Sequence, residues 1–144
     1  MKLEPGRVLL SVVMVTMGIL HFTHKEVFAA VMPEYLPWHI PLVLISGVFE
    51  AALGIGLLFE RTRVLAAYGL VALFIAVYPA NINMALHPER HIAGAPFQPS
   101  AAMLWARLPL QFVFIWIALR YAKKGDAKRD AQSTKPRDFA SPST

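Results

Sequence analysis

The chain contains no cysteine among its 144 residues. Without cysteine there can be no disulfide, no thiolate metal site, no cysteine-ligated iron–sulfur cluster and no thiol nucleophile. Any redox chemistry in which this protein takes part must therefore use a bound cofactor or a partner protein.

Charge is also scarce. Asp, Glu, Lys and Arg make up 16% of the chain, whereas 56% of it is hydrophobic and the mean hydropathy is +0.49. A soluble domain carries about 25% charged residues, because its surface faces water. Most of this chain's surface must face another solvent, and the lipid bilayer is the obvious one. The composition excludes an ordinary soluble domain.

Four apolar segments are long enough to cross a bilayer, which takes about 20 helical residues at about 1.5 Å each. The fourth segment must take Arg107 into the membrane, because the run between Arg107 and Arg120 is too short to span. The first segment has no small-x-small cleavage site, so we interpret it as an uncleaved helix. We predict an all-α, integral membrane four-helix bundle within residues 1–123, with helices at about 7–25, 38–59, 64–87 and 101–122.

The positions of lysine and arginine predict the orientation. If the N-terminus is cytoplasmic, eleven of the fourteen Lys and Arg residues lie on the cytoplasmic side. Cytoplasmic loops are enriched in these residues, so both termini are predicted to be cytoplasmic. The short link at residues 60–63 should make the second and third helices antiparallel neighbours.

Residues 124–144 are basic, with many Ser, Thr and Pro and one aromatic residue. Such a segment cannot bury enough apolar surface to offset its ordering entropy, so we predict a disordered cytoplasmic tail. Beside a spanning helix, its charge is better explained by attraction to anionic lipid than by nucleic acid. We expect the bilayer as a partner and no nucleic acid.

Polar residues interrupt all four apolar segments. Counting the helical rise from the segment ends places them near the bilayer centre or in its outer half. Because four helices contribute groups at similar depth, we take them as candidate ligand-binding residues, with no catalytic residue assigned. The six candidates are His21, Glu50, Asn81, Asn83, Arg107 and Gln111.

Glu50 is the only acid within the predicted spans. A lone carboxylate there is costly unless it pairs, faces water or stays protonated. We predict that it pairs with Arg107, directly or through one polar group. The simpler explanation for Asn83 and Gln111 is hydrogen bonding between helices, and for His21 it is packing. A small-residue face at Ser46, Gly47, Ala51 and Gly54 is predicted to let another helix approach closely.

Histidine is the remaining residue type that could bind a metal. All five histidines fall on the predicted outer side, but their spacing is scattered and no two share a depth that suits a haem. We expect no metal site and no covalently bound cofactor. The five are His21, His24, His39, His87 and His91.

Several motifs together resemble one family. They are His21 with Phe22, segment 46–50 (Ser-Gly-Val-Phe-Glu), segment 78–85 (Tyr-Pro-Ala-Asn-Ile-Asn-Met-Ala) and segment 107–111 (Arg-Leu-Pro-Leu-Gln). Across residues 7–122 the chain resembles the DoxX-like family of small four-helix bacterial membrane proteins. Lys25 departs from the family pattern, which often has Pro there. The six candidate residues are the positions shared with its motifs.

The resemblance implies a multi-pass protein of the bacterial inner (plasma) membrane. The family takes its name from relatives that act as a subunit of a thiosulfate:quinone oxidoreductase, and others occur beside oxidative-stress or quinone-detoxification proteins. The leading hypothesis is therefore an accessory or quinone-interacting subunit of a membrane redox or oxidative-stress system. Its partners would be membrane or cytoplasmic redox proteins, and any enzymatic role would be that of a non-autonomous subunit.

Two alternatives stay open. The chain could be a non-catalytic membrane assembly or stabilising protein, in which the polar residues only join helices. It could instead bind or act on a small lipidic molecule, with Glu50 as acid or base. Four helices without an internal repeat argue against an independent transporter unless the chain forms a homo-oligomer.

Overall fold

The computed structural model describes residues 4–30, 32–87 and 100–133. Helices are the regular structure of these ranges, and no strand is present in them. The helices are α1 (Pro5–Thr23), α2 (Lys25–Ala30), α3 (His39–Gly56), α4 (Arg63–Leu86) and α5 (Ala101–Ser133).

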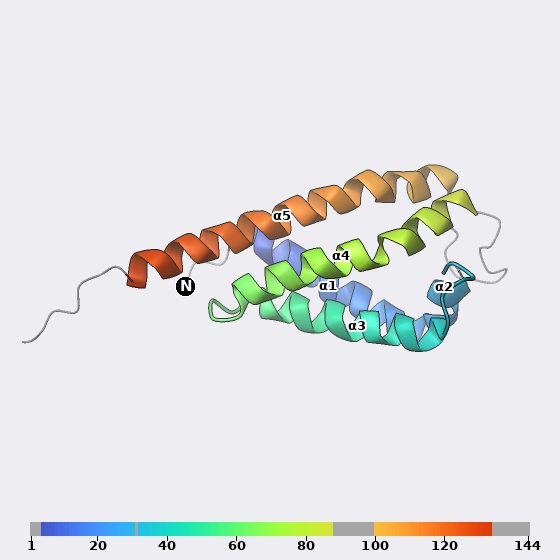
Figure 1. Ribbon diagram of the computed structural model, residues 1–144, viewed down its shortest axis with the longest axis horizontal. Coiled ribbons are helices and arrows are strands. Elements are labelled where there is room, and N and C mark those ends of the chain that lie inside the picture. The colour runs from blue at the N-terminus through green and yellow to red at the C-terminus, as the bar shows by residue number, and fades with distance from the viewer. Residues whose placement is uncertain (1–3, 31, 88–99, 134–144) are drawn as a thin grey trace, which may run out of the picture.

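Four of these helices are long and apolar enough to cross a membrane: α1, α3, α4 and the part Ala101–Ala127 of α5. They lie alongside one another along the length of the molecule (Figure 1). The prediction of an all-helical chain with four such helices is confirmed for the described residues. The short α2 falls in a stretch with frequent proline, which limits helix length.

The helices associate in two pairs, α1 with α3 and α4 with α5, and contacts between α3 and α4 join the pairs. Thr62 closes the turn between α3 and α4 by donating its hydroxyl to the carbonyl of Gly56 (2.8 Å). This turn makes α3 and α4 antiparallel neighbours, as predicted (Figure 1). The more extensive packing is nevertheless within the two pairs.

Small residues set the crossing of α1 and α3. A Cβ atom added to Gly18 would lie 2.6 Å from the carbonyl oxygen of Gly47 and 2.9 Å from the backbone nitrogen of Ala51. The hydroxyl of Ser11 donates to the carbonyl of Gly54 (2.6 Å) further along the same interface. The small face predicted on α3 is therefore in contact with α1, which supplies a glycine of its own.

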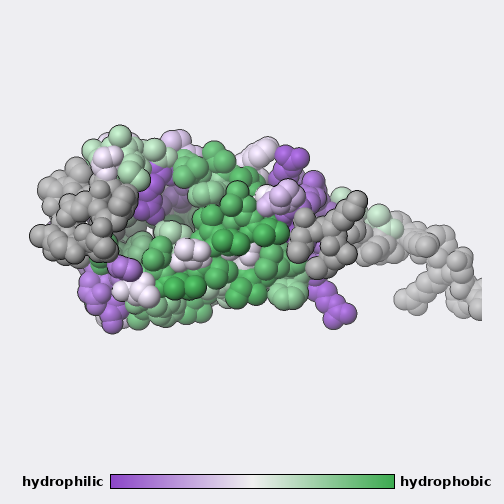
Figure 2. All heavy atoms as spheres, turned by 180° about the vertical axis from the view of Figure 1, so that it is seen from behind, coloured by the Kyte–Doolittle hydropathy of each residue, from purple (hydrophilic) through white to green (hydrophobic). Residues whose placement is uncertain are grey.

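Side chains from α1, α4 and α5 and the end of α3 fill the interior. The core cluster is small, and alanine provides much of it: Leu10, Met14, Leu57, Ala66, Ala67, Leu70, Phe74, Ala118 and Ala122. Many large apolar side chains point outward instead, including Leu65 at 73% exposure. Figure 2 shows hydrophobic residues across the middle of one face and hydrophilic ones gathered toward both ends, as expected for a bundle that faces lipid.

The last helix is longer than predicted. The sequence suggested an end near residue 122 and a disordered tail from residue 124, whereas α5 continues to Ser133. Residues 123–133 are rich in Ala, Lys, Arg and Gln, which favour helix, and Tyr68 of α4 donates to Asp126 (3.2 Å). Residues 134–144 of the predicted tail lie outside the described residues.

Candidate functional site

His21 and Glu50 form a buried pair between α1 and α3. The Nδ1 atom of His21 lies 3.3 Å from Oε2 of Glu50, and the two side chains are 11% and 9% exposed. They meet where the glycines let the helices cross, since a Cβ atom on Gly47 would lie 2.7 Å from the Cβ of His21. The ring of Phe28 in α2 stacks on the imidazole at 4.1 Å. Three helices therefore hold the imidazole in place.

The hydrogen bonds of this pair are incomplete. Nδ1 of His21 is 2.8 Å from the carbonyl oxygen of Met17, an acceptor, so Nδ1 carries a hydrogen and donates it there. Glu50 Oε2 is buried and has no hydrogen-bond partner among the described residues. A buried carboxyl oxygen without a donor is costly. The pair therefore retains the capacity to accept a hydrogen bond from a bound molecule.

Arg107 of α5 is half-buried, and its Nη1 atom lies 3.7 Å from the sulfur of Met84. A thioether is a weak acceptor, so this contact leaves most of the guanidinium's hydrogen-bonding capacity unused. Arg107 attracts Glu50 and repels a protonated His21 electrostatically. The direct Arg107–Glu50 ion pair that we expected is absent from the described residues, because Glu50 contacts His21 instead. Pairing through an intervening polar group stays a prediction.

Asn81 and Gln111 join α4 to α5. The amide of Asn81 donates to Oε1 of Gln111 (2.6 Å), and the amide of Gln111 donates to the carbonyl of Phe74. Pro79 has no N–H for the carbonyl of Ile75, and the neighbouring carbonyl, that of Phe74, receives the Gln111 amide. Both side chains are therefore accounted for by helix packing.

The structure thus divides the six predicted residues. His21 and Glu50 belong to the α1/α3 pair, whereas Asn81, Gln111 and Arg107 belong to the α4/α5 pair. Asn83 is half-buried on α4 and is engaged in contacts of its own. The groups with unused hydrogen-bonding capacity are Glu50 on one side and Arg107 on the other.

A family model described as "Domain of unknown function (DUF8561)" matches residues 10–122. The chain belongs to the DUF8561 family. This region contains the apolar parts of all four long helices and every candidate site residue. No curated protein and no solved structure matches the chain.

A second buried polar cluster lies at the other end of the DUF8561 bundle, and the sequence did not predict it. Arg7 of α1, only 1% exposed, donates to Glu60 in the turn after α3 (2.8 Å), and Arg63 of α4 lies 3.0 Å from the same carboxylate. Three of their guanidinium nitrogens, Nε and Nη2 of Arg7 and Nε of Arg63, are buried without a partner among the described residues.

This cluster was missed because arginines at the ends of spanning segments are expected to reach the headgroups. A signal was present in the sequence: Glu60 is followed by two basic residues, Arg61 and Arg63, in a turn too short to keep it away from them. The cluster fixes α1 to the α3–α4 turn. It lies partly outside the DUF8561 match, which begins after Arg7.

Possible metal ligands are scattered in the described part of the DUF8561 chain. No group of three or more His, Asp or Glu side chains lies close enough there to hold an ion. Nε2 of His39 donates to the carbonyl of Pro33 (3.1 Å), and His91 lies outside the described residues.

Proposed function

We propose that this chain is a DoxX-like, multi-pass protein of the bacterial inner membrane. In this proposal it binds a quinone in the outer half of the bundle, as an accessory subunit of a membrane redox or oxidative-stress system. One observation carries the proposal. The buried Glu50–His21 pair has an acceptor oxygen without a donor, and Arg107, which attracts Glu50 electrostatically, has only the thioether of Met84 as its hydrogen-bonding neighbour within the described residues.

The chemistry of a quinone suits these groups. A quinone has an apolar ring and two carbonyl oxygens, so it needs an apolar slot with N–H donors at its ends. The guanidinium of Arg107 offers several donors in a planar fork. Oε2 of Glu50 lacks a donor, so it can accept a hydrogen bond from a hydroxyl of the reduced quinone, or, when protonated, donate to the second carbonyl, where reduction requires a proton. The electrons would come from a partner protein, because the chain has no cysteine and no resident redox group is proposed.

The orientation is part of the proposal. Fusions of alkaline phosphatase or of a fluorescent protein after Arg61 and after Lys124 should report the cytoplasm at both points, since eleven of fourteen Lys and Arg residues would then be cytoplasmic. A fusion after Pro33 should report the opposite side. Phosphatase activity at the Arg61 turn would overturn the orientation and, with it, the placement of the site in the outer half.

Quinone binding is tested with the purified full chain and a soluble short-chain ubiquinone. Binding is read from quenching of tryptophan fluorescence, to which Trp105, two residues from Arg107, contributes. Arg107→Gln is expected to weaken binding about tenfold or more, because a charge-assisted hydrogen bond is worth about 1.5–3 kcal/mol. Thermal stability should change little, because Arg107 makes no ion pair within the described residues.

The matched control is Lys123→Gln, which removes an exposed cation from the same helix. It should leave both quenching and stability unchanged. If wild type and Arg107→Gln show the same negligible quenching while both remain folded, the quinone proposal is wrong.

A non-catalytic assembly role is the second candidate, and a specific observation favours it. Asn81, Gln111 and the carbonyl of Phe74 satisfy one another, as expected of polar groups that only join helices. If the purified chain carries a stoichiometric protein partner and no quinone, this candidate replaces the first. If the chain binds another small lipidic molecule, that lipid should co-purify with wild type and be absent from the purified Arg107→Gln variant.

A further inference from the structure

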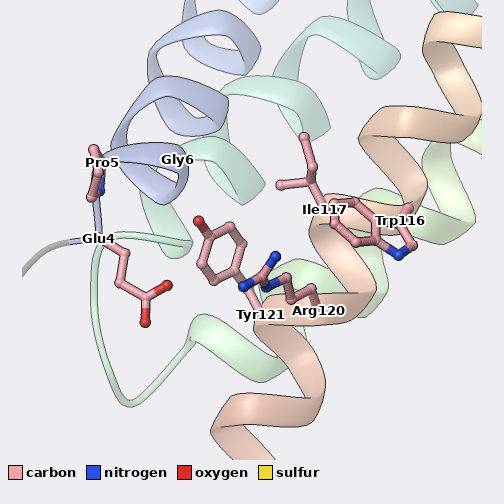
Figure 3. A pocket seen from close by; sticks show the side chains of 7 residues that line it. All are labelled: Glu4, Pro5, Gly6, Trp116, Ile117, Arg120 and Tyr121. Carbon is pink, nitrogen blue, oxygen red and sulfur yellow. The ribbon is translucent and has the colours of Figure 1, made fainter.

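A pocket of about 280 Å³ lies between the start of α1 and residues 116–121 of α5, far from Glu50 and Arg107 along the bundle. Figure 3 shows its two walls, one from each helix. Its lining consists of Glu4, Pro5, Gly6, Trp116, Ile117, Arg120 and Tyr121. Ligand pockets measure about 300–1,000 Å³, so this one suits a headgroup rather than a whole lipid.

The first polar group on the pocket wall is the hydroxyl of Tyr121. The side chain is buried, with 7% exposure, and the hydroxyl has no hydrogen-bond partner within the described ranges. It points to the first turn of α1, where a Cβ atom on Gly6 would lie 2.6 Å from it (Figure 3). Pro5 has no N–H, and the N–H groups of Arg7 and Val8 already donate to the carbonyl of Glu4, so the donor that this wall offers is the Tyr121 hydroxyl.

The second polar group is the guanidinium of Arg120. It lies 5.6 Å from the ring centroid of Trp116, and no carboxylate contacts it in the part of the chain that the structure describes. A guanidinium held against an aromatic face keeps its in-plane N–H groups available. Arg120 therefore supplies a positive charge that Glu4 attracts but does not contact, with donors in a fixed plane.

The acid on the wall is already neutralised. Lys124 donates to both oxygens of Glu4 (2.9 and 3.0 Å), and this hydrogen bond lowers the pKa of Glu4. Glu4 is thus occupied by a cation of this chain and is not free to receive an ammonium group from a ligand. The net charge that remains on the wall is that of Arg120.

The apolar part of the pocket indicates where its ligand comes from. Trp116 and Ile117 continue into the lipid-facing surface of α5, and Trp116 is 59% exposed. Tryptophan and arginine at the end of a spanning segment are typical of the boundary between headgroups and acyl chains. A ligand here would have an anionic head beside Arg120 and an apolar tail along α5.

We propose that this pocket is a binding site for the phosphodiester of an anionic glycerophospholipid, held by the Arg120 guanidinium and the Tyr121 hydroxyl. An anionic lipid is favoured over a zwitterionic one because Glu4, the acid that an ethanolamine ammonium would need, is bound to Lys124. The site is independent of the quinone proposal, since the two share no residue.

The test is native mass spectrometry of the full chain in detergent, titrated with phosphatidylglycerol or phosphatidylethanolamine of identical acyl chains. Wild type should bind one phosphatidylglycerol more tightly than it binds phosphatidylethanolamine. Arg120→Gln should weaken the first phosphatidylglycerol about tenfold, the usual effect of losing one charge-assisted hydrogen bond. Tyr121→Phe should weaken it about threefold, as for a neutral hydrogen bond.

The matched control is again Lys123→Gln, an exposed cation on the same turn that does not line the pocket. It should change phosphatidylglycerol binding less than twofold. An equal loss in Lys123→Gln and Arg120→Gln would mean a diffuse charge effect and would overturn the proposal. Equal affinity for the two lipids, or displacement of phosphatidylglycerol by millimolar inorganic phosphate, would overturn its lipid specificity in the same way.

Discussion

Gly18→Leu is expected to lower the free energy of unfolding by about 3 kcal/mol, the upper end of the range for overpacked interiors. The groups that the new side chain meets are the carbonyl of Gly47 and the backbone of Ala51, which cannot rotate away as a flexible side chain could. The helices must separate, and the contact between His21 and Glu50 would be lost with their crossing. The measurement is unfolding of the purified chain by SDS in mixed micelles.

Thr16→Leu is the control for Gly18→Leu, because it adds a leucine to the same helix at an exposed position. Its stability should stay near that of wild type. Equal stability of the Gly18 and Thr16 variants would mean that α1 and α3 do not cross at these glycines.

His21→Leu should destabilise the fold by about 1–3 kcal/mol, the usual cost of leaving a buried polar group unmatched. The substitution leaves the Glu50 carboxyl buried without its close neighbour. Replacing both residues by leucine should restore much of the stability, since no polar group is then left unmatched. A double-mutant cycle in the same SDS assay measures the coupling.

His24→Leu controls for the loss of a histidine near the end of α1, because His24 contacts the exposed hydroxyl of Thr23 rather than a buried acid. It should have little effect. Additive effects of the His21 and Glu50 substitutions would show that the two side chains do not depend on each other.

Hydropathy was sufficient to predict the number, approximate place and class of the long helices, because a bilayer imposes one length and one composition on any spanning helix. It did not predict which helices pair. That choice depends on where small residues face each other, and the glycine of α1 that meets α3 has no period or motif to mark it. The end of α5 was placed too early, because low hydropathy does not distinguish a disordered tail from a polar helix.

The candidate site, too, was predictable from the sequence only in part. The helical rise predicts a depth for each polar residue, but it did not identify the partner of Glu50. Opposite charge favoured Arg107, whereas the close crossing at Gly18 and Gly47 brings His21 to the carboxylate first. The burial of Arg7 could not be predicted either, because the position of a residue near the start of a helix does not show whether its side chain points inward or outward.

The two-pair arrangement of the helices has a consequence for biogenesis. Each close pair consists of successive long helices, so α1 and α3 can be docked while α4 and α5 are still to be synthesised. Pairing of helices that are adjacent in the sequence requires only short loops to close, whereas contacts between distant segments slow assembly. The contacts that close the bundle come last, when Lys124 reaches back to Glu4 across nearly the whole chain. That ion pair can form only once synthesis has reached Lys124, near the end of the apolar part of α5, so it marks a completed bundle.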